Sequence, residues 1–296
     1  IALALLRGTA LAVLLATVLL IGSIVRGGIG VTTWEFLSSA PTEGMTHGGI
    51  FPAIFGTVCI TLLMIVMALP LGVCAAIYMV EYAGNSGLAR VIRASVNNLA
   101  GVPSIVFGLF GVGFFILFIG RSIDRVRGGG LLFGQPAMLW AAATLAVLVL
   151  PVIIVNTAEA LTAVPRSHRE ASFALGATRW QTVSRVVLPQ ARAGILTGSI
   201  LSISRGAGET APILFTGCAY FLPRLPIVHL GVPFTGLSVP MVNPLDQFME
   251  LSYHIFIMAT QSTDAAATRP IQYGTTLVLV ALTFLLNLAA ISLRVR

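Results

Sequence analysis

The sequence predicts an all-α integral membrane protein with six transmembrane helices. Of its 296 residues, 57% are hydrophobic and only 9% are charged, whereas a soluble domain typically has about a quarter charged residues. The mean hydropathy is +0.97. The hydrophobic residues are also gathered in six runs, each long enough for the roughly 20 residues that cross a bilayer.

The first four predicted spans are residues 5–25, 52–80, 95–119 and 137–160. The run after Arg7 is also compatible with a signal peptide, but it exceeds the roughly 7–15 residues of that apolar core. We expect Pro70 to kink the second span, because proline cannot donate to the carbonyl of Val66. At the start of the third span, Asn97, Asn98 and Ser104 either line a polar cavity or bind neighbouring helices.

The last two predicted spans are residues 193–221 and 271–293, and two long polar segments precede them, 162–190 and 222–270. In the second segment, Asp246, Glu250 and His254 recur every four residues, as on one face of a helix. A metal or proton site is conceivable there, but we favour a solvated face of an interfacial helix over a seventh span. The other histidines and the three cysteines lack metal-ligand spacing, so we expect no metal site and no catalytic centre.

An even number of spans places both termini on one side of the membrane. Arginines are more frequent on the side of the termini and of segment 162–190, so the positive-inside rule makes that side cytoplasmic and segment 222–270 extracytoplasmic. The net charge of +7 is thus explained by membrane-flanking arginines rather than by nucleic-acid binding. The chain contains no lysine. It therefore has no Walker A loop, and any ATP hydrolysis belongs to another polypeptide.

Two opposite charges, Arg205 and Glu209, lie inside the fifth predicted span. Charges at that depth are costly in lipid and usually mark a polar pathway or an internal ion pair. Their i, i+4 spacing allows them to pair along one helix face, and a guanidinium offers a two-pronged hydrogen-bonding site to an oxyanion. The alternative is a purely structural salt bridge.

Small residues recur every four positions beside this pair, at Gly194, Gly198, Ser202 and Gly206. Such a stripe lets another helix approach closely, and we expect a second permease subunit to pack there, with Arg205 at the shared pore. Pro212 cannot donate to the carbonyl of Gly208, so a bare acceptor is expected one residue from Glu209.

Segment 162–190 predicts two short helices separated by a break at Gly176. It is either a plain interfacial linker or a segment that docks into a groove on a partner. Glu170, Ala171, Gly176, Leu188 and Pro189 have the spacing of the EAA motif, and the segment resembles the coupling loop of type I (MetI-like) ABC importer permeases; it departs from that motif at Ser172 and Val186. The resemblance implies a single permease domain over residues 1–296, with Glu170 facing an ATPase and Gly176 permitting the turn.

Two further stretches, 98–109 and the Arg205-Gly-Ala-Gly-Glu209-Thr210-Ala-Pro212 segment, resemble permeases of phosphate-specific ABC importers, in particular the PstA-type subunit. This resemblance implies a substrate pathway at Arg205, Glu209 and Thr210. It also implies the bacterial inner membrane and four partners: a PstC-type permease, a dimeric PstB-type ATPase that binds ATP and Mg²⁺, a PstS-type extracytoplasmic binding protein, and inorganic phosphate. No cofactor is expected in this chain itself.

Three other functions remain open at this point. The cargo is another oxyanion such as molybdate or sulfate, or the chain is the partner phosphate permease. A secondary transporter that uses Glu209 is a third possibility, although we find no inverted repeat typical of that class. An intramembrane enzyme is disfavoured, because no Ser-His or paired-Asp arrangement lies at membrane depth.

Overall fold

The computed structural model describes residues 2–84, 86–231, 238–262 and 264–295. Within these residues six helical stretches are long and apolar enough to cross a membrane, and this confirms the predicted fold class. They are Leu5–Gly28, Phe51–Tyr82, Ser104–Arg127, Met138–Ala163, Arg179–Gly206 and Ala265–Ser292.

The helices follow in the order α1 (Ala2–Gly28), α2 (Trp34–Ser38), α3 (Phe51–Ile77), α4 (Gly87–Ala100), α5 (Ser104–Phe110), α6 (Arg121–Arg127), α7 (Met138–Ala163), α8 (Arg166–Ala174), α9 (Arg179–Thr182), α10 (Leu188–Gly206), α11 (Ala211–Thr216), α12 (Leu251–Gln261) and α13 (Ala265–Val295). A 3-10 turn, η1 (Glu43–Met45), precedes β2, and π-helical stretches η2 (Tyr78–Tyr82), η3 (Gly111–Gly120) and η4 (Val183–Val187) extend α3, α5 and α9. Two small hairpins complete the chain, β1 (Pro41–Thr42) with β2 (His47–Gly48), and β3 (Ile227–Gly231) with β4 (Ser238–Val242).

The centre of the molecule is α7, in which 72% of the most apolar 18-residue stretch is buried. Helices α3 and α10 pack along it, and its alanines let these neighbours approach closely. Leu145, Leu148, Val149 and Ile153 are almost completely inaccessible. Pro70 and Pro151 lie inside α3 and α7, which nevertheless continue as helices through them.

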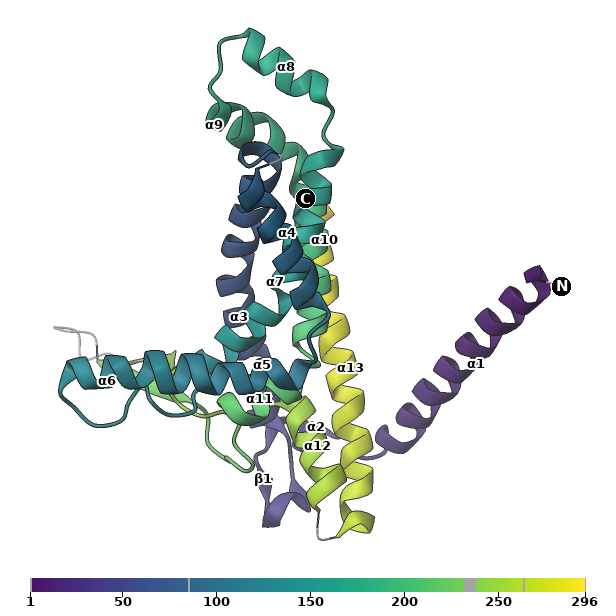
Figure 1. Cartoon of the computed structure of the whole chain (residues 1–296). Coiled ribbons are helices and arrows are strands. Elements are labelled where there is room, and N and C mark those ends of the chain that lie inside the picture. Colours follow the sequence, from purple (N-terminus) through teal and green to yellow (C-terminus); the bar gives the residue numbers. More distant parts are fainter. Residues whose placement is uncertain (1, 85, 232–237, 263, 296) are drawn as a thin grey trace.

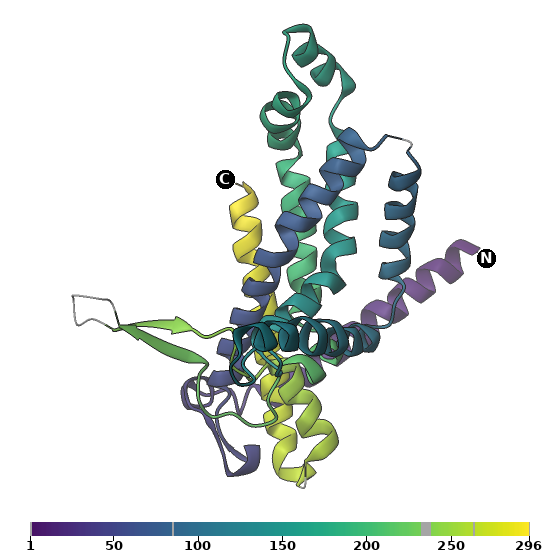
Figure 2. The ribbon, with the colours of Figure 1, turned by 60° about the vertical axis from the view of Figure 1, so that its left-hand side comes forward.

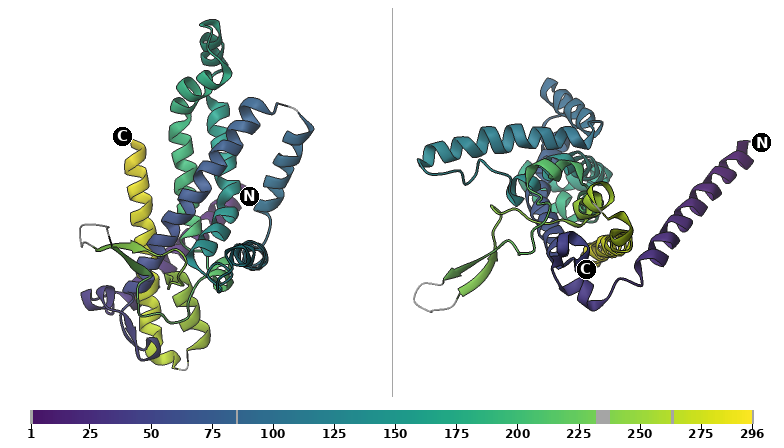
Figure 3. Two further views of the ribbon diagram at one scale, coloured as in Figure 1. Left: turned by 90° about the vertical axis from the view of Figure 1, so that its left-hand side faces the viewer. Right: turned by 90° about the horizontal axis from the view of Figure 1, so that it is seen from below.

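Two spans leave this bundle. Helix α1 diverges from the rest of the chain (Figure 1), and none of its apolar window is buried. It is held near its C-terminal end, where Gly27 and Gly28 lie against Tyr273 of α13. The stretch from α5 to α6 runs crosswise to the bundle, and the views in Figure 3 show it and α1 projecting in different directions. Their exposed apolar side chains are suited to lipid.

The third predicted span, 95–119, is wrong in its boundaries. Residues 95–100 belong to α4, a separate amphipathic helix, and the spanning helix starts at Ser104. Pro103 explains the interruption: it disfavours helical backbone at the preceding residue, Val102. The fifth predicted span, 193–221, is also interrupted. Helix α10 ends at Gly206 and the short α11 starts at Ala211 with Pro212 in its first turn, a position that proline favours.

The loop 162–190, with α8 and α9, lies at one end of the bundle, and α12 and the β1–β2 hairpin lie at the other (Figure 1). The C-terminal end of α13 points toward the α8–α9 end. The β3–β4 ribbon projects sideways from the bundle (Figure 2). Residues 232–237 of the predicted extracytoplasmic segment lie outside the described part of the chain.

The predicted solvated face of Asp246, Glu250 and His254 is wrong. Helix α12 starts only at Leu251, so Asp246 precedes it. Glu250 and His254 are each only 2% exposed, because α12 packs against α3 and α13 rather than lying on a membrane surface. No metal-binding group of histidine, cysteine or acidic residues occurs among the residues searched in the described chain.

Candidate functional site: a broken helix and a coupling loop

The two intramembrane charges lie where α10 ends and α11 has not yet begun. We call residues 207–210 the helix break. Arg205 is in the last turn of α10, and its Nε lies 3.6 Å from Oε1 of Glu209. The side chains of Arg205 and Glu209 are 37% and 20% exposed. Within the described part of the chain, no hydrogen bond engages the terminal nitrogens of Arg205, so its two-pronged donor edge is available to a ligand.

The backbone of the break is loosely bonded. The amides of Gly208 and Glu209 donate to the carbonyls of Arg205 and Gly206 across 3.4 Å each, near the long limit for such bonds. Thr210 caps α11 without a side-chain hydrogen bond. Pro212 is at the start of α11 rather than inside a continuous helix. The chain therefore lacks more than the one helical hydrogen bond to the Gly208 carbonyl that the sequence predicted to be lost: the helix itself is interrupted.

Four other helices hold the break in place. Gly206 lies against Met64 of α3, and Gly108 of α5 lies against the backbone of Ala211 and Pro212. Ser204 donates to Oδ1 of Asn287 on α13 at 2.9 Å. Ser252 of α12 approaches the carbonyl of Glu209 at 3.3 Å.

The small-residue stripe on α10 faces this same chain. Gly194 and Gly198 lie against Ala160 and Asn156 of α7, and Gly206 lies against Met64. Ser202 is fully buried and donates to the carbonyl of Gly198. The prediction that a second permease packs on this stripe is therefore wrong, because α7 and α3 already fill it.

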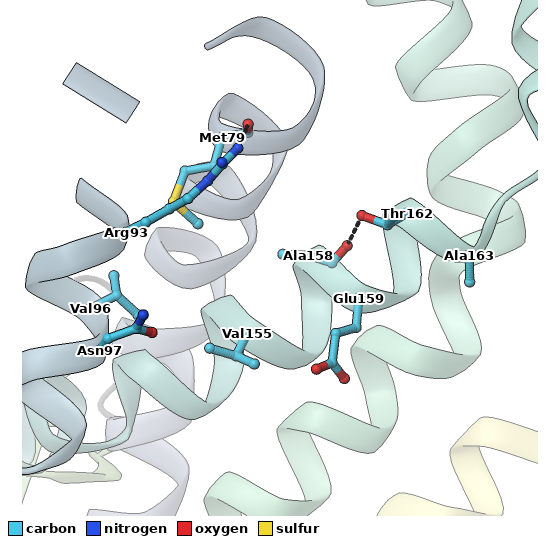
Figure 4. A pocket seen from close by; sticks show the side chains of 9 residues that line it. All are labelled: Met79, Arg93, Val96, Asn97, Val155, Ala158, Glu159, Thr162 and Ala163. Atoms are coloured by element: carbon cyan, nitrogen blue, oxygen red, sulfur yellow. Dashed lines mark hydrogen bonds between the residues drawn. The ribbon is translucent and has the colours of Figure 1, made fainter. Parts of the chain in front are cut away.

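Asn97 lines a cavity of about 550 Å³ between α4 and α7 (Figure 4). Arg93 on α4 and Glu159 on α7 bring opposite charges to it. Neither Arg205 nor Glu209 is among its lining residues, so the structure does not bring Asn97 together with the helix break. Asn98 is exposed near the end of α4 and Ser104 is half-buried at the start of α5. Sequence reasoning missed Arg93 and Glu159, although Arg93 has an i, i+4 relation to Asn97 that would indicate a shared face.

A second cavity, of about 480 Å³, lies toward the coupling loop and shares Arg93 and Thr162 with the first. Its other lining residues come from η2 and α8, including Glu81, Arg166, Arg169 and Glu170. The two cavities thus adjoin between the spans and loop 162–190, the first lined mainly by apolar side chains and the second by more charged ones.

Residues 162–190, which we call the coupling loop after the motif they resemble, run from the end of α7 through α8, a turn, α9 and η4 to the first turn of α10. Gly176 has φ +81°, a left-handed conformation that side chains other than glycine rarely adopt. Thr178 and Gln181 then form a capping box at the start of α9. Ser172 Oγ and Thr182 Oγ1 lie 2.9 Å apart and connect the two helices. Ser172, which stands where the EAA motif has alanine, therefore connects α8 to α9, a role that the sequence comparison did not predict.

The outer surface of this loop is exposed and partly apolar. Glu170 and Ala171 are exposed on α8, and Leu175 and Trp180 are 89% and 60% exposed. Leu188 and Pro189 start α10, with the proline in the first turn. Exposed apolar surface of this kind is typical of a site that meets a protein partner.

Arg169 connects the loop to the spans. Its guanidinium donates to Glu81 Oε1 at 2.8 Å and to the carbonyls of Leu161 and Val164 at 2.8 and 2.6 Å. Glu81 belongs to η2, the continuation of α3. Leu161 is in the last turn of α7 and Val164 is its C-cap. We call this set the Arg169 clamp. It ties α8 to the ends of both central helices and satisfies carbonyls that a helix end leaves open.

The family of binding-protein-dependent transport system inner membrane components matches residues 68–295. This chain belongs to that family. The probable ABC transporter permease protein YqgI of Bacillus subtilis (strain 168) is 34% identical over 272 residues, which cover 90% of this chain and 85% of that protein. The phosphate transport system permease protein PstA of Yersinia pestis is 37% identical over 245 residues, covering 82% and 78%.

The fold agrees with this assignment. A bacterial alginate ABC transporter, crystallised with an alginate pentasaccharide-bound periplasmic protein, matches with a TM-score of 0.62 at 14% identity, covering 95% of this chain and 92% of that one. The chain is thus a multi-pass permease component of an ABC importer, a transporter subunit of a kind that works with a binding protein and an ATPase. Family membership also removes the secondary-transporter alternative.

Proposed function

We propose that this chain is the PstA-type permease subunit of an ATP-driven phosphate importer in a bacterial cytoplasmic membrane. The observation that carries the proposal is Arg205 at an interruption of a spanning helix, with terminal nitrogens that donate to no acceptor among the described residues. Relatives whose names include phosphate transport support phosphate as the cargo. An intramembrane guanidinium can neutralise a charged oxyanion and bind it through paired hydrogen bonds.

The loose pair provides a reason why Glu209 is present. In the absence of substrate, Glu209 lowers the cost of holding Arg205 in the membrane. At 3.6 Å the carboxylate is not tightly bonded, so an incoming anion can take over the guanidinium. The displaced carboxylate then repels the bound anion and favours its release. This exchange of partners at Arg205 favours transient binding of the anion during transport over tight binding.

The remaining parts of the proposal concern the partners. The exposed surface at Glu170, Leu175 and Trp180 docks on a dimeric PstB-type ATPase, which binds ATP and Mg²⁺, so the coupling loop and both termini are cytoplasmic. A PstC-type permease completes the pore on a surface other than the small-residue stripe. A PstS-type protein delivers phosphate from the side of α12. Closure of the ATPase moves the coupling loop, and the Arg169 clamp carries that movement to α3 and α7.

Uptake of radiolabelled phosphate by the assembled importer in vesicles tests the proposal. Arg205→Ala is expected to lower uptake roughly 10- to 100-fold, since charge-assisted hydrogen bonds contribute about 1.5–3 kcal/mol. Arg205→Lys keeps the charge but not the planar fork, and we expect an intermediate rate. Arg125→Ala, at an exposed arginine of α6, is the control for loss of one positive charge. Undiminished uptake by Arg205→Ala in an intact complex contradicts the proposal.

Competition experiments decide the cargo. Unlabelled phosphate is expected to suppress uptake, whereas molybdate and sulfate in the same excess leave it unchanged. Stronger suppression by either of the other two anions would assign the importer to that oxyanion.

A further inference from the structure

Glu250 is a buried carboxyl group that the transport proposal does not use. It forms the N-cap of α12, outside the six spans, and is 2% exposed. Its Oε2 accepts hydrogen bonds from the backbone amide of Tyr253 at 2.8 Å and from Ser252 Oγ at 2.5 Å. Burial raises the pKa of Glu250 to about 7, although these hydrogen bonds act in the opposite direction.

No cation offsets the charge of Glu250 within the described part of the chain. On α12 itself, burial lowers the pKa of His254 to about 4, so that imidazole is neutral near pH 7. Burial also raises the pKa of the Cys218 thiol, which therefore stays protonated. The elements packed around α12 carry further titratable or charged groups. They are Cys59, Cys74 and Tyr78 on α3 and η2, Arg269 and Tyr273 on α13, Tyr220 after α11, Tyr253 on α12 itself, Asp246 before it, and the pair Arg205 and Glu209 at the helix break.

Ser252 lies between Glu250 and the helix break. Its Oγ is 2.5 Å from Glu250 Oε2 and 3.3 Å from the backbone carbonyl oxygen of Glu209. A serine hydroxyl has one hydrogen to donate. Ser252 can therefore donate fully to only one of these two acceptors at a time.

The protonation state of Glu250 decides which acceptor is used. When Glu250 is ionised it can only accept, so the hydroxyl of Ser252 donates to it and the Glu209 carbonyl lacks this donor. When Glu250 takes up a proton, its own O–H donates to Ser252 Oγ. The hydrogen of Ser252 is then released to donate to the Glu209 carbonyl. One proton is bound and the hydrogen bond between Glu250 and Ser252 changes direction.

We propose that Glu250 is a proton-binding site that controls the helix break through Ser252, holding the Glu209 carbonyl when protonated and releasing it when ionised. The importance of this latch for transport rests on the proposed role of Arg205 and Glu209, but its existence does not. Its effect reaches a segment whose own hydrogen bonds are already long, at 3.4 Å. A single added hydrogen bond therefore has a measurable effect on local opening.

Backbone hydrogen exchange of the helix break tests the latch in the assembled importer, without phosphate or nucleotide. Exchange of the Gly208 and Glu209 amides is measured by mass spectrometry from about pH 5.5 to about pH 8.5, relative to amides of α7 to remove the intrinsic pH effect. In the wild type we expect relative exchange to rise roughly 2- to 10-fold across the pKa of Glu250, which corresponds to the net contribution of one hydrogen bond.

Three variants distinguish the latch from a direct effect of charge. Glu250→Gln removes the titration and Ser252→Ala removes the connection, and both are expected to abolish the pH step. In Ser252→Ala the donor to the Glu209 carbonyl is absent, so exchange should stay at the high-pH level at every pH. Ser252→Thr keeps the hydroxyl and is expected to retain the step. Ser204→Ala removes a different serine contact beside the break, that to Asn287, and serves as the matched control.

A wild type without a pH step, or a step that persists in Ser252→Ala, would overturn the latch. The second result would mean that the charge of Glu250 acts through space. Because no substrate is present, the result is independent of the transport proposal. Arg205→Ala should keep the pH step even if it loses uptake, and a missing step leaves the uptake experiments unaffected.

Discussion

Two arginine–glutamate pairs in this chain have the same chemistry and opposite geometry. In the Arg169 clamp, the guanidinium lies 2.8 Å from Glu81 and also donates to two helix-end carbonyls, and its side chain is 16% exposed. At the helix break, Arg205 lies 3.6 Å from Glu209, makes no further hydrogen bond within the described residues, and is 37% exposed. The guanidinium of Arg169 donates to three protein acceptors, whereas that of Arg205 keeps donors that no described residue accepts.

This difference separates a mechanical role from a ligand-binding role. Removing one member of a buried, fully bonded pair leaves an uncompensated charge and is strongly destabilising. A partly exposed and loosely bonded pair contributes less to stability, so its residues remain available for exchange with a ligand. The clamp is accordingly expected to respond mainly in stability and coupling, and the break mainly in transport.

The largest effect on stability is expected for Arg169→Ala. It leaves Glu81 and the carbonyls of Leu161 and Val164 without their donor, at a cost of about 3 kcal/mol. We expect a lower unfolding temperature in detergent and loss of ATPase co-purification. Arg185→Ala, at an exposed arginine of the same loop, should change stability by less than about 0.5 kcal/mol. Equal behaviour of the two variants would show that the clamp does not connect the loop to the spans.

A smaller effect is expected for Gly176→Ala in the same loop. Apart from the two neighbours of Gly176 in the chain, no described residue has an atom within 4 Å of an added Cβ, so the cost comes from the left-handed backbone alone, about 1–2 kcal/mol. Gly176→Asn should cost less, because asparagine tolerates this conformation better. Thermal unfolding of both variants checks this order. If alanine and asparagine are equally harmful, the cause is a partner surface rather than the turn.

Some members of these two pairs could be predicted from the sequence, and others could not. Arg205 and Glu209 stand out because charge is rare in an apolar run, and the EAA spacing identifies the coupling loop. The predictions failed for two spans, 95–119 and 193–221, that hydropathy alone showed as continuous helices. Proline and glycine at 101–103 and 206–212 divide them, and apolar content alone does not show such breaks.

Contacts between residues far apart in the sequence could not be predicted for a different reason. Glu81 and Arg169 are 88 positions apart, and no local pattern relates them. Glu250 and His254 have a polar spacing typical of a solvated face, yet α12 is buried because it packs against α3 and α13. The small-residue stripe correctly indicated close helix packing, but sequence does not distinguish a helix of the same chain from one of a partner.

The smallest effect on stability, and the sharpest test of the contrast, is expected for Glu209→Gln. Because the pair is partly exposed and 3.6 Å long, the free energy of unfolding should change by less than about 1 kcal/mol. Phosphate uptake should nevertheless fall about tenfold, since a neutral amide no longer repels the anion from Arg205, and about 1.4 kcal/mol of tighter holding slows release tenfold. Glu43→Gln is the matched control: Glu43 pairs with His47 at the same spacing and 3.6 Å distance, but on an exposed loop. It should alter neither quantity. If Glu209→Gln instead destabilises the protein as much as Arg169→Ala, the pair at the break is structural, and the two arginine–glutamate pairs differ only in their surroundings.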